Sequence, residues 1–190
     1  MRDLLVASGT AEISFAGPVP RADARLGIEE LRFPAAYTSF LQIALAATDF
    51  GDLTTSGAVR GSAVITDNAP RALTLQLADV DLIDRKGKVR INDITGLVQW
   101  RDSAAADDPQ STLRWSSGGA YGLSGGAAEI RFRTYANNFA LTQPARLPVF
   151  DGAVAIESFA LGKLGSDDLE IDFEAEIEPI SMPLICEAFG

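Results

Sequence analysis

The chain has 190 residues, of which 47% are hydrophobic, and it carries a net charge of −10 with no histidine. This hydrophobic fraction is sufficient for a buried core, which excludes a disordered chain. The acidic balance excludes nucleic-acid binding through clustered Lys and Arg, and the absence of histidine excludes a Ser-His-Asp triad and the commonest transition-metal ligand. We therefore predict that the protein is not an enzyme and that it uses no metal or cofactor.

Most of the chain is predicted to form strands, because apolar residues recur at every second position between clusters of Gly, Asp, Asn and Pro. The first such segment, TAEISF, covers residues 10–15. A helix is predicted near residues 35–47, because Tyr37 and Phe40 begin an apolar pattern at helical spacing after Pro34. Its apolar character predicts that this helix is buried against a sheet or covers one.

Further alternating segments follow, each with one apolar side and one polar side. Their apolar positions are Leu73, Leu75 and Leu77; Val89 and Ile91; Ile130 and Phe132; Val154 and Ile156; and Leu169, Ile171, Phe173 and Ile177. The apolar positions change parity after Leu77 and after Ile156, which predicts β-bulges that coil the sheet. Turn-forming residues at 84–88, 150–152 and 165–168 allow successive strands to pair antiparallel.

A short helix is predicted at the C-terminal end, with Ser181 as its N-cap and Pro183 in its first turn. Cys186, the only cysteine, is predicted to be a small buried apolar side chain. The predicted fold is mainly β: a long, twisted, bulged antiparallel meander that forms a taco-like groove or a closed clam. We expect residues 1–190 to be a single elongated segment of a larger protein.

The segment DLEIDFEAEIEPISM, residues 168–182, places a carboxylate at every second position. Residues i and i+2 of a strand are about 6.6–6.8 Å apart along one face, whereas oxygens bound to one Ca²⁺ lie within about 2.6 Å of the ion. This spacing suits a glycosidase pair, but identical neighbours give no difference in pKa between the two carboxyl groups. We therefore interpret the acids as the solvated side of a strand, with Arg131 and Arg133 as basic cross-strand partners.

The glycine-rich segment SSGGAYGLSGG, residues 116–126, lacks the Lys and Ser/Thr of a phosphate-binding loop. It is predicted to be a strand with bulges or tight bends. Trp100 and Trp115 are predicted to pack in a sheet, or alternatively to provide flat platforms for a sugar or a lipid head group. The residues therefore leave open a second function, that of a non-catalytic β-rich carbohydrate-binding or adhesion module.

Five phrases of the sequence occur in the order found in a known family. They are DFGDLTTSGAVRGSAVITDNAPRALTLQLADVDLID, INDITGLVQWRD, LRWSSGGAYGLSGGAAEI, ARLPVFDGAVAIESFAL and LEIDFEAEIEPISM. Together they resemble the C-terminal half of the YdbH-like branch of the AsmA-like bridge-like lipid-transfer proteins, over residues 31–190. An older label on the same domain is "dicarboxylate transport".

The resemblance implies a periplasmic protein that carries phospholipid between the inner and outer membranes and is anchored to the inner membrane through another part of the parent chain. It also implies a long taco-shaped β-sheet with an apolar concave side, and a small outer-membrane lipoprotein as a partner. The apolar positions named above are then the candidate groove residues, in contact with phospholipid acyl chains. Burial of a sixteen-carbon chain contributes on the order of 10 kcal/mol, at about 0.8 kcal/mol per CH₂, so no polar anchor is required.

Overall fold

The computed structural model describes residues 5–15, 19–42, 51–104 and 109–189. Within these ranges the chain forms one sheet of 13 strands and two short helical segments. The strands are β1 (Leu5–Ser14), β2 (Arg21–Arg32), β3 (Leu53–Thr66), β4 (Ala69–Asp84), β5 (Val89–Arg101), β6 (Ser111–Trp115), β7 (Ser117–Ala120), β8 (Leu123–Gly125), β9 (Ala128–Tyr135), β10 (Asn138–Leu141), β11 (Ala145–Val149), β12 (Gly152–Gly162) and β13 (Glu170–Ile177). The helical segments are η1 (Tyr37–Leu41) and α2 (Met182–Phe189).

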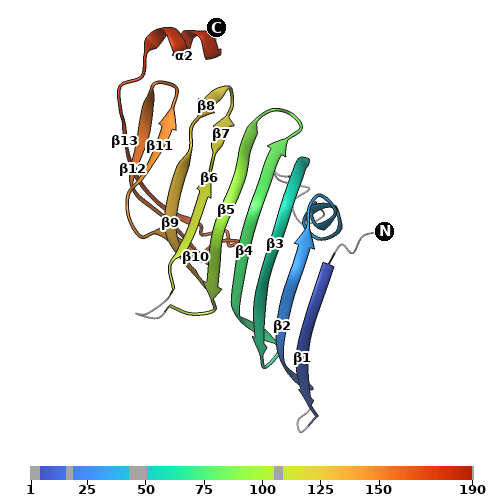
Figure 1. Ribbon diagram of the computed structural model, residues 1–190. Helices are drawn as coiled ribbons and strands as arrows, with labels where there is room; N and C mark the ends of the chain where they lie inside the picture. Colours follow the sequence, from blue (N-terminus) through green and yellow to red (C-terminus); the bar gives the residue numbers. More distant parts are fainter. Residues whose placement is uncertain (1–4, 16–18, 43–50, 105–108, 190) are drawn as a thin grey trace.

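The sheet is a meander in which most consecutive strands pair antiparallel (Figure 1). Strands β6 and β7 both pair with β5, at successive positions along it. On their other sides, β6 pairs with β9 and β7 pairs with β8. Strands β10 and β11 both pair with β12. One short contact is parallel, where Trp100 and Arg101 of β5 lie beside Thr134 and Tyr135 of β9. The predicted fold class, a mainly β, twisted antiparallel meander, is therefore confirmed.

Both parity changes predicted from the sequence are β-bulges. The register of β4 against β5 shifts between Leu77 and Val80, and that of β12 against β13 shifts between Ile156 and Ser158. The predicted turns also occur, between β4 and β5, between β11 and β12, and between β12 and β13. The glycine-rich segment forms the β7–β8 hairpin, which is the tightly bent strand expected.

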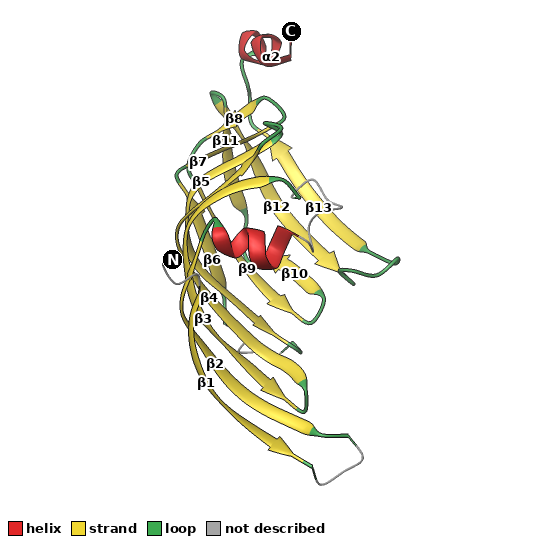
Figure 2. Cartoon of the chain, turned by 90° about the vertical axis from the view of Figure 1, so that its right-hand side faces the viewer, coloured by secondary structure: helices red, strands yellow, loops and turns green. Residues whose placement is uncertain are grey.

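Irregular residues lie side by side in three central strands. Gly57 in β3, Asp79 in β4 and Asp93 in β5 have φ values of 94°, 48° and 55°. A Cβ atom at Gly57 would lie 2.3 Å from the Asp79 carbonyl oxygen, so glycine is required there. The Ser56 hydroxyl donates to Asp81 Oδ2 at 2.6 Å, and the Asp93 N–H donates to Asp81 Oδ1 at 2.9 Å. Because bulges bend and twist strands, this row contributes to the curvature of the sheet in Figure 2.

A cluster of buried apolar side chains lies near these irregular residues. Val59, Val80 and Ile94 form the centre of a hydrophobic cluster and are 7%, 2% and 6% exposed. Half-buried side chains surround them: Leu31, Phe33, Leu75, Leu77, Leu82, Ile91, Leu113 and Trp115. This cluster therefore joins the central strands, and Phe132, Ala145 and Ala153 are buried in the second half of the sheet.

The described part of the helix predicted near 35–47 is helical, with η1 as a π-helical turn. Ala36 and Tyr37 are buried, and the Tyr37 hydroxyl accepts a hydrogen bond from the Leu53 N–H at 3.1 Å. Figure 2 shows this segment on the concave side of the curved sheet, as a helix covering a sheet was expected to be. The rest of the predicted helix, from residue 43, lies outside the described residues.

The predicted C-terminal helix is present as α2, beyond the end of the sheet (Figure 1). Cys186 lies on this helix and is exposed, so the prediction of a buried side chain is wrong. The physical reason is the position of α2, which places the thiol away from the sheet against which it was expected to pack. In the part of the chain that the structure describes, neither helical segment has the length and apolar character needed to cross a membrane.

Candidate functional site: the apolar face of the sheet

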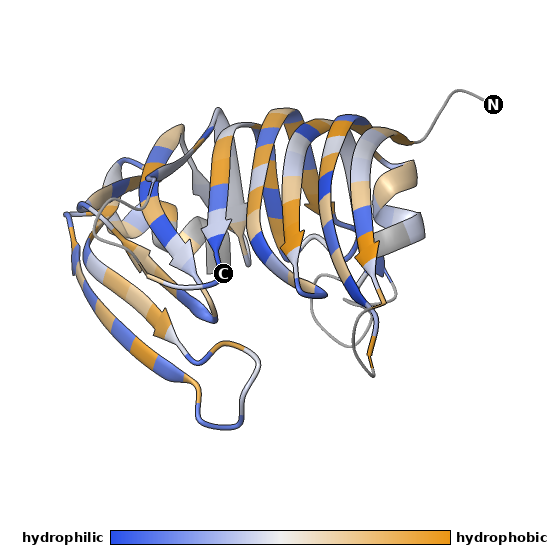
Figure 3. Ribbon diagram, turned by 90° about the horizontal axis from the view of Figure 1, so that it is seen from below, coloured by the Kyte–Doolittle hydropathy of each residue, from blue (hydrophilic) through white to orange (hydrophobic). Residues whose placement is uncertain are grey.

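Cross-strand register divides the sheet into two faces, because directly opposite residues of an antiparallel pair point to the same side. One row of successive partners, running from β1 to β9, consists of Leu5, Leu31, Val59, Leu77, Gly96, Leu113 and Ile130. A neighbouring row on the other side consists of Arg60, Gln76, Leu97, Thr112 and Arg131. We call the side of the first row the apolar face and the other side the outer face, and Figure 3 shows the resulting alternation along the strands.

The apolar face continues through the second half of the sheet as a row of phenylalanine rings. Phe132, two residues after Ile130 in β9, stacks on Phe139 with ring centroids 4.9 Å apart. Phe139 then contacts Phe159 at 5.8 Å, and Phe159 contacts Phe173 at 5.9 Å, both with edge-to-face geometry. The row crosses β9, β10, β12 and β13, so one apolar surface runs from one edge strand to the other.

Exposure varies strongly along this face. At the centre, Val80 is almost fully covered, whereas at the two edges Ile13 of β1 and Phe173 of β13 are 55% and 58% exposed. Ile171 and Ile177 on β13 are also exposed, at 63% and 70%. Apolar side chains are therefore available to a ligand at both edges and are packed together between them.

Nearly all the groove residues predicted from the sequence lie on strands with their neighbours on the apolar face. Leu73, Leu75 and Leu77 lie opposite Ala63, Gly61 and Val59, and Val154 and Ile156 lie opposite Ile177 and Ala175. Val89 and Ile91 lie opposite Ala120 and Gly118, and Ile130 and Phe132 lie opposite Leu113 and Ser111. Leu169 differs, since it is exposed and immediately precedes β13.

Several residues of the apolar face were not predicted from the sequence. Leu26 and Ile28 of β2 belong to it, but the register of β2 shifts between Ile28 and Leu31, which interrupts their alternation. Phe139 lies in β10, which has only 4 residues, too few to show a period. In both cases the assignment to the apolar face depends on which strands pair, and a single sequence does not contain that information.

The carboxylates of β13 lie on the outer face opposite small side chains of β12. Glu170, Asp172, Glu174 and Glu176 lie opposite Gly162, Ala160, Ser158 and Ala155, respectively. Arg131 and Arg133 lie in β9, opposite Thr112 of β6 and Ala140 of β10. The prediction that these two arginines are cross-strand partners of the acids is therefore wrong, because β12 and β10 lie between β9 and β13.

Two ion pairs hold the ends of the acidic strand. Lys163 Nζ lies 2.6 Å from Glu170 Oε1 at its start. After its end, Arg146 of β11 donates two hydrogen bonds to Glu178, from Nε at 2.7 Å and Nη2 at 2.6 Å, and this contact lowers the pKa of the Glu178 carboxyl group. Among the described residues, no three Asp, Glu or Cys side chains are placed to hold a metal ion.

Both tryptophans are half-buried and interact with the sheet. Trp115 packs against the central hydrophobic cluster, and the Trp100 indole N–H donates to the Ala136 carbonyl oxygen at 2.8 Å. These contacts agree with the interpretation that the rings serve packing.

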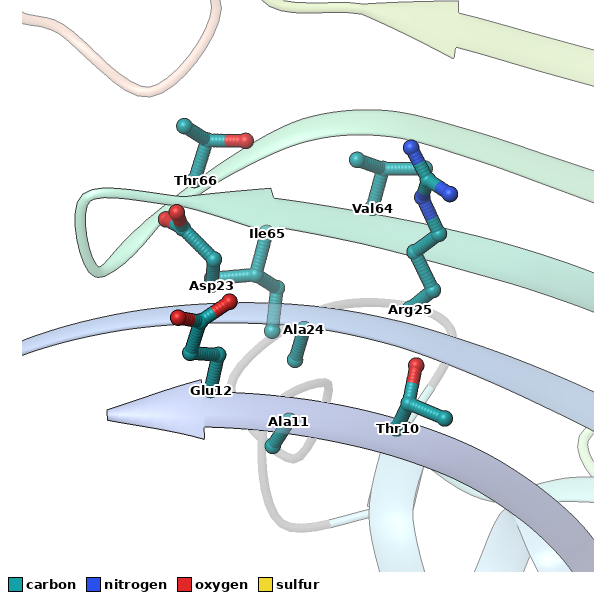
Figure 4. A pocket seen from close by; sticks show the side chains of 9 residues that line it. All are labelled: Thr10, Ala11, Glu12, Asp23, Ala24, Arg25, Val64, Ile65 and Thr66. Atoms are coloured by element: carbon teal, nitrogen blue, oxygen red, sulfur yellow. The ribbon is translucent and has the colours of Figure 1, made fainter. Parts of the chain in front are cut away.

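A hollow over β1, β2 and β3 is the most polar depression described (Figure 4). Its lining includes Glu12 and Asp23, which are direct cross-strand partners of like charge, and Arg25. Residues of the apolar face, such as Ala11 and Ala24, also line it. Because both sides of the same three strands contribute, the hollow is not an enclosed ligand cavity.

Comparisons with known proteins do not assign the chain to a family. No family model, curated protein or solved structure matches it. The feature with the clearest chemical use is therefore the apolar face itself, which is continuous across the sheet and open at both edges. Such a face binds apolar chains without needing a specific polar group, because removal of apolar surface from water drives the association.

Proposed function

We propose that this chain is a non-enzymatic segment of a bridge-like protein that carries phospholipid between two membranes, with the acyl chains on the apolar face. The observations that carry the proposal are the row of cross-strand partners from β1 to β9 and the row of phenylalanine ring contacts from β9 to β13, with exposed side chains at both edges. The resemblance of the sequence to the YdbH-like branch of the AsmA-like proteins points to the same function.

The physical properties of the sheet suit an acyl chain. Backbone N–H and C=O groups inside the sheet pair with neighbouring strands, so the face presents side chains rather than unsatisfied polar groups. The apolar rows run across the strands, which makes the direction perpendicular to the strands the path for a lipid. Each CH₂ group that leaves water contributes about 0.8 kcal/mol, whereas the polar head group is best left in water.

The cellular setting belongs to the same proposal. The chain would lie in the periplasm, held at the inner membrane by another part of its parent protein, and would deliver phospholipid toward the outer membrane. Its partners would be the rest of the parent chain and a small outer-membrane lipoprotein. Neither nucleic acid nor a cofactor has a role in this function.

The proposal is tested by photo-crosslinking at two adjacent positions on opposite faces of β13. Phe173 lies on the apolar face and Asp172 on the outer face, and both side chains are exposed. A crosslinking amino acid at 173 is expected to label co-purified phospholipid, detected by mass spectrometry, and one at 172 is expected not to. Leu26 and Arg25 of β2 form a second matched pair, since both are exposed and they point to opposite faces.

Native mass spectrometry of the unmodified chain is expected to show bound phospholipid. Equal labelling from both positions of each pair would contradict the proposal, because a solvated outer face has no reason to hold acyl chains. Absence of lipid in the native spectrum, together with absence of labelling, would also contradict it.

A further inference from the structure

A short helical stretch covers one end of the apolar face. Residues 35–42, which we call the covering segment, are helical and lie on the concave side of the sheet (Figure 2). Ala36 and Tyr37 of this segment are 1% and 3% exposed. The Tyr37 hydroxyl accepts a hydrogen bond from the backbone N–H of Leu53, the first residue of β3. The covering segment is therefore attached to the sheet at the beginning of β3.

The sheet residues at this end of the strands are shut off from water. Leu53 and Thr55 of β3 are 7% and 3% exposed, and Asp84 of β4, which lies opposite Leu53, is 3% exposed. Thr55 Oγ1 has no hydrogen-bond partner among the described residues. A hydroxyl group on an open groove would be hydrated, because an unpaired polar group is costly to remove from water. The burial of this hydroxyl therefore means that the groove is closed at the beginning of β3.

Toward the opposite end of the same strands, the apolar face is more accessible. One row of cross-strand partners there consists of Leu26, Ala63, Leu73 and Trp100, on β2 to β5. Leu26 is 41% exposed and the other three side chains are half-buried. The only polar group of these side chains is the Trp100 indole N–H, which donates to the Ala136 carbonyl oxygen. This row, which we call the open row, therefore presents apolar surface without an unpaired polar group.

We propose that acyl chains cross the central strands along the open row and that the covering segment excludes them from the other end of the face. The inference rests on the proposed function and assigns the part of the face that performs it. The covering segment occupies the concave side at the beginning of β3. The side chains at that end also include the Thr55 hydroxyl and the Asp84 carboxyl group, which an acyl chain in contact with them would deprive of water.

This division of the face lies in the interior of the sheet. Strands β2, β3, β4 and β5 each pair with a described strand on both sides. The covering segment connects β2 to β3 along the chain and is held at β3. The exclusion is therefore the same whatever pairs with either edge of the sheet.

Photo-crosslinking at Leu73 and Leu82 compares the two ends on one strand. Both leucines belong to the apolar face of β4 and both are half-buried, but Leu73 lies in the open row and Leu82 lies opposite Thr55. A crosslinking amino acid at 73 is expected to label co-purified phospholipid with a yield about tenfold higher than one at 82. Mass spectrometry of the crosslinked chain measures both yields.

A second substitution tests whether the covering segment causes this difference. Tyr37→Ala removes the buried ring and the acceptor of the Leu53 N–H, so it is expected to raise labelling from 82 and to leave labelling from 73 unchanged. Ser39→Ala is the matched control, because Ser39 lies on the same segment but is exposed, and it is expected to change neither yield. Circular dichroism of each variant checks that the β-sheet content is retained.

The outcomes separate this inference from the proposed function. Equal labelling from 73 and 82 in the chain with Tyr37 would overturn the exclusion and leave lipid binding by the face intact. Labelling from neither position, together with none from 173, would contradict the proposed function and with it this inference. Labelling from 82 that stays low in a folded Tyr37→Ala variant, or rises equally with Ser39→Ala, would overturn the role of the covering segment.

Discussion

The centre of the apolar face and its β13 edge have the same chemical character but opposite surroundings. Val59, Val80 and Ile94 at the centre are packed against a shell of half-buried side chains. Ile171 and Ile177 at the edge alternate in the same way with polar residues, yet they remain mostly exposed. Alternation alone therefore does not decide whether a strand contributes to the core or presents a surface.

What differs between the two regions is the number of neighbours. Strands β3, β4 and β5 each have a strand on both sides, and side chains from β2 and β6 join their cluster. Among the described strands, β13 pairs only with β12. The same face thus stabilises the fold in the middle of the sheet and is free for a ligand at its edge, which predicts that substitutions in the two regions affect different properties.

The largest loss of stability is expected when a side chain at the centre of the apolar face is truncated. Val80→Ala removes two methyl groups from a side chain that is 2% exposed and is expected to lower the free energy of unfolding by about 2 kcal/mol. Ile177→Ala removes more atoms from a side chain that is 70% exposed and is expected to lower it by less than about 0.5 kcal/mol. Urea unfolding followed by circular dichroism measures both, and equal losses would show that the edge is covered in solution.

The fold was predictable from the sequence where strands alternate cleanly or change phase. The parity changes after Leu77 and Ile156 gave the positions of two bulges, because one extra residue on one strand shifts every later side chain to the other side. The exposure of the Cys186 side chain was not predictable, since it depends on where α2 lies relative to the sheet and not on the apolar character of the helix.

The side of a strand on which each candidate site residue lies was predictable from the sequence, but its cross-strand partners were not. The carboxylates of β13 were correctly interpreted as the side of the strand opposite its apolar residues, because spacing along one strand determines that arrangement. The identity of their cross-strand partners was wrong, because Arg131 and Ala160 are equally compatible with the sequence and only the pairing of β12 with β13 selects Ala160. Long-range register is the information that a single sequence lacks.

A smaller loss of stability is expected when a residue is substituted at the bulges beside the central cluster. The pKa of the Asp81 carboxyl group is lowered, first by the hydrogen bond from the Ser56 hydroxyl and then by that from the Asp93 N–H. The folded state therefore favours the ionised form of this carboxyl group. Its contribution to the free energy of unfolding is complete above the unfolded pKa of about 3.9. The contribution is lost as the pH falls through the lower pKa of the folded state. Asp81→Asn is expected to cost about 1 kcal/mol at pH 7, because the group is partly exposed.

The measurement is urea unfolding of wild type and Asp81→Asn at pH 7 and near pH 3. The difference between the two proteins is expected to shrink at the lower pH, because pH 3 lies below the unfolded pKa of the Asp81 carboxyl group and part of the advantage of its ionised form is then lost. Asp172→Asn at the β13 edge is the matched control, and because Asp172 lies opposite Ala160 it is expected to change the midpoint less. A difference that grows on acidification would contradict the assigned role of Asp81.

The smallest effect is expected where the edge strand is tied to the sheet. Glu178 accepts two hydrogen bonds from Arg146, but both side chains are substantially exposed, so water and salt screen their attraction. Glu178→Gln is expected to lower the urea midpoint slightly at low ionic strength and not at about 1 M salt, where the Debye length is about 3 Å. Glu176→Gln, opposite Ala155, is the control and removes a charge without removing this contact. A loss for Glu178→Gln alone would show that β13 is held at its end by this ion pair, whereas equal losses would mean that the acidic strand responds only to its total charge.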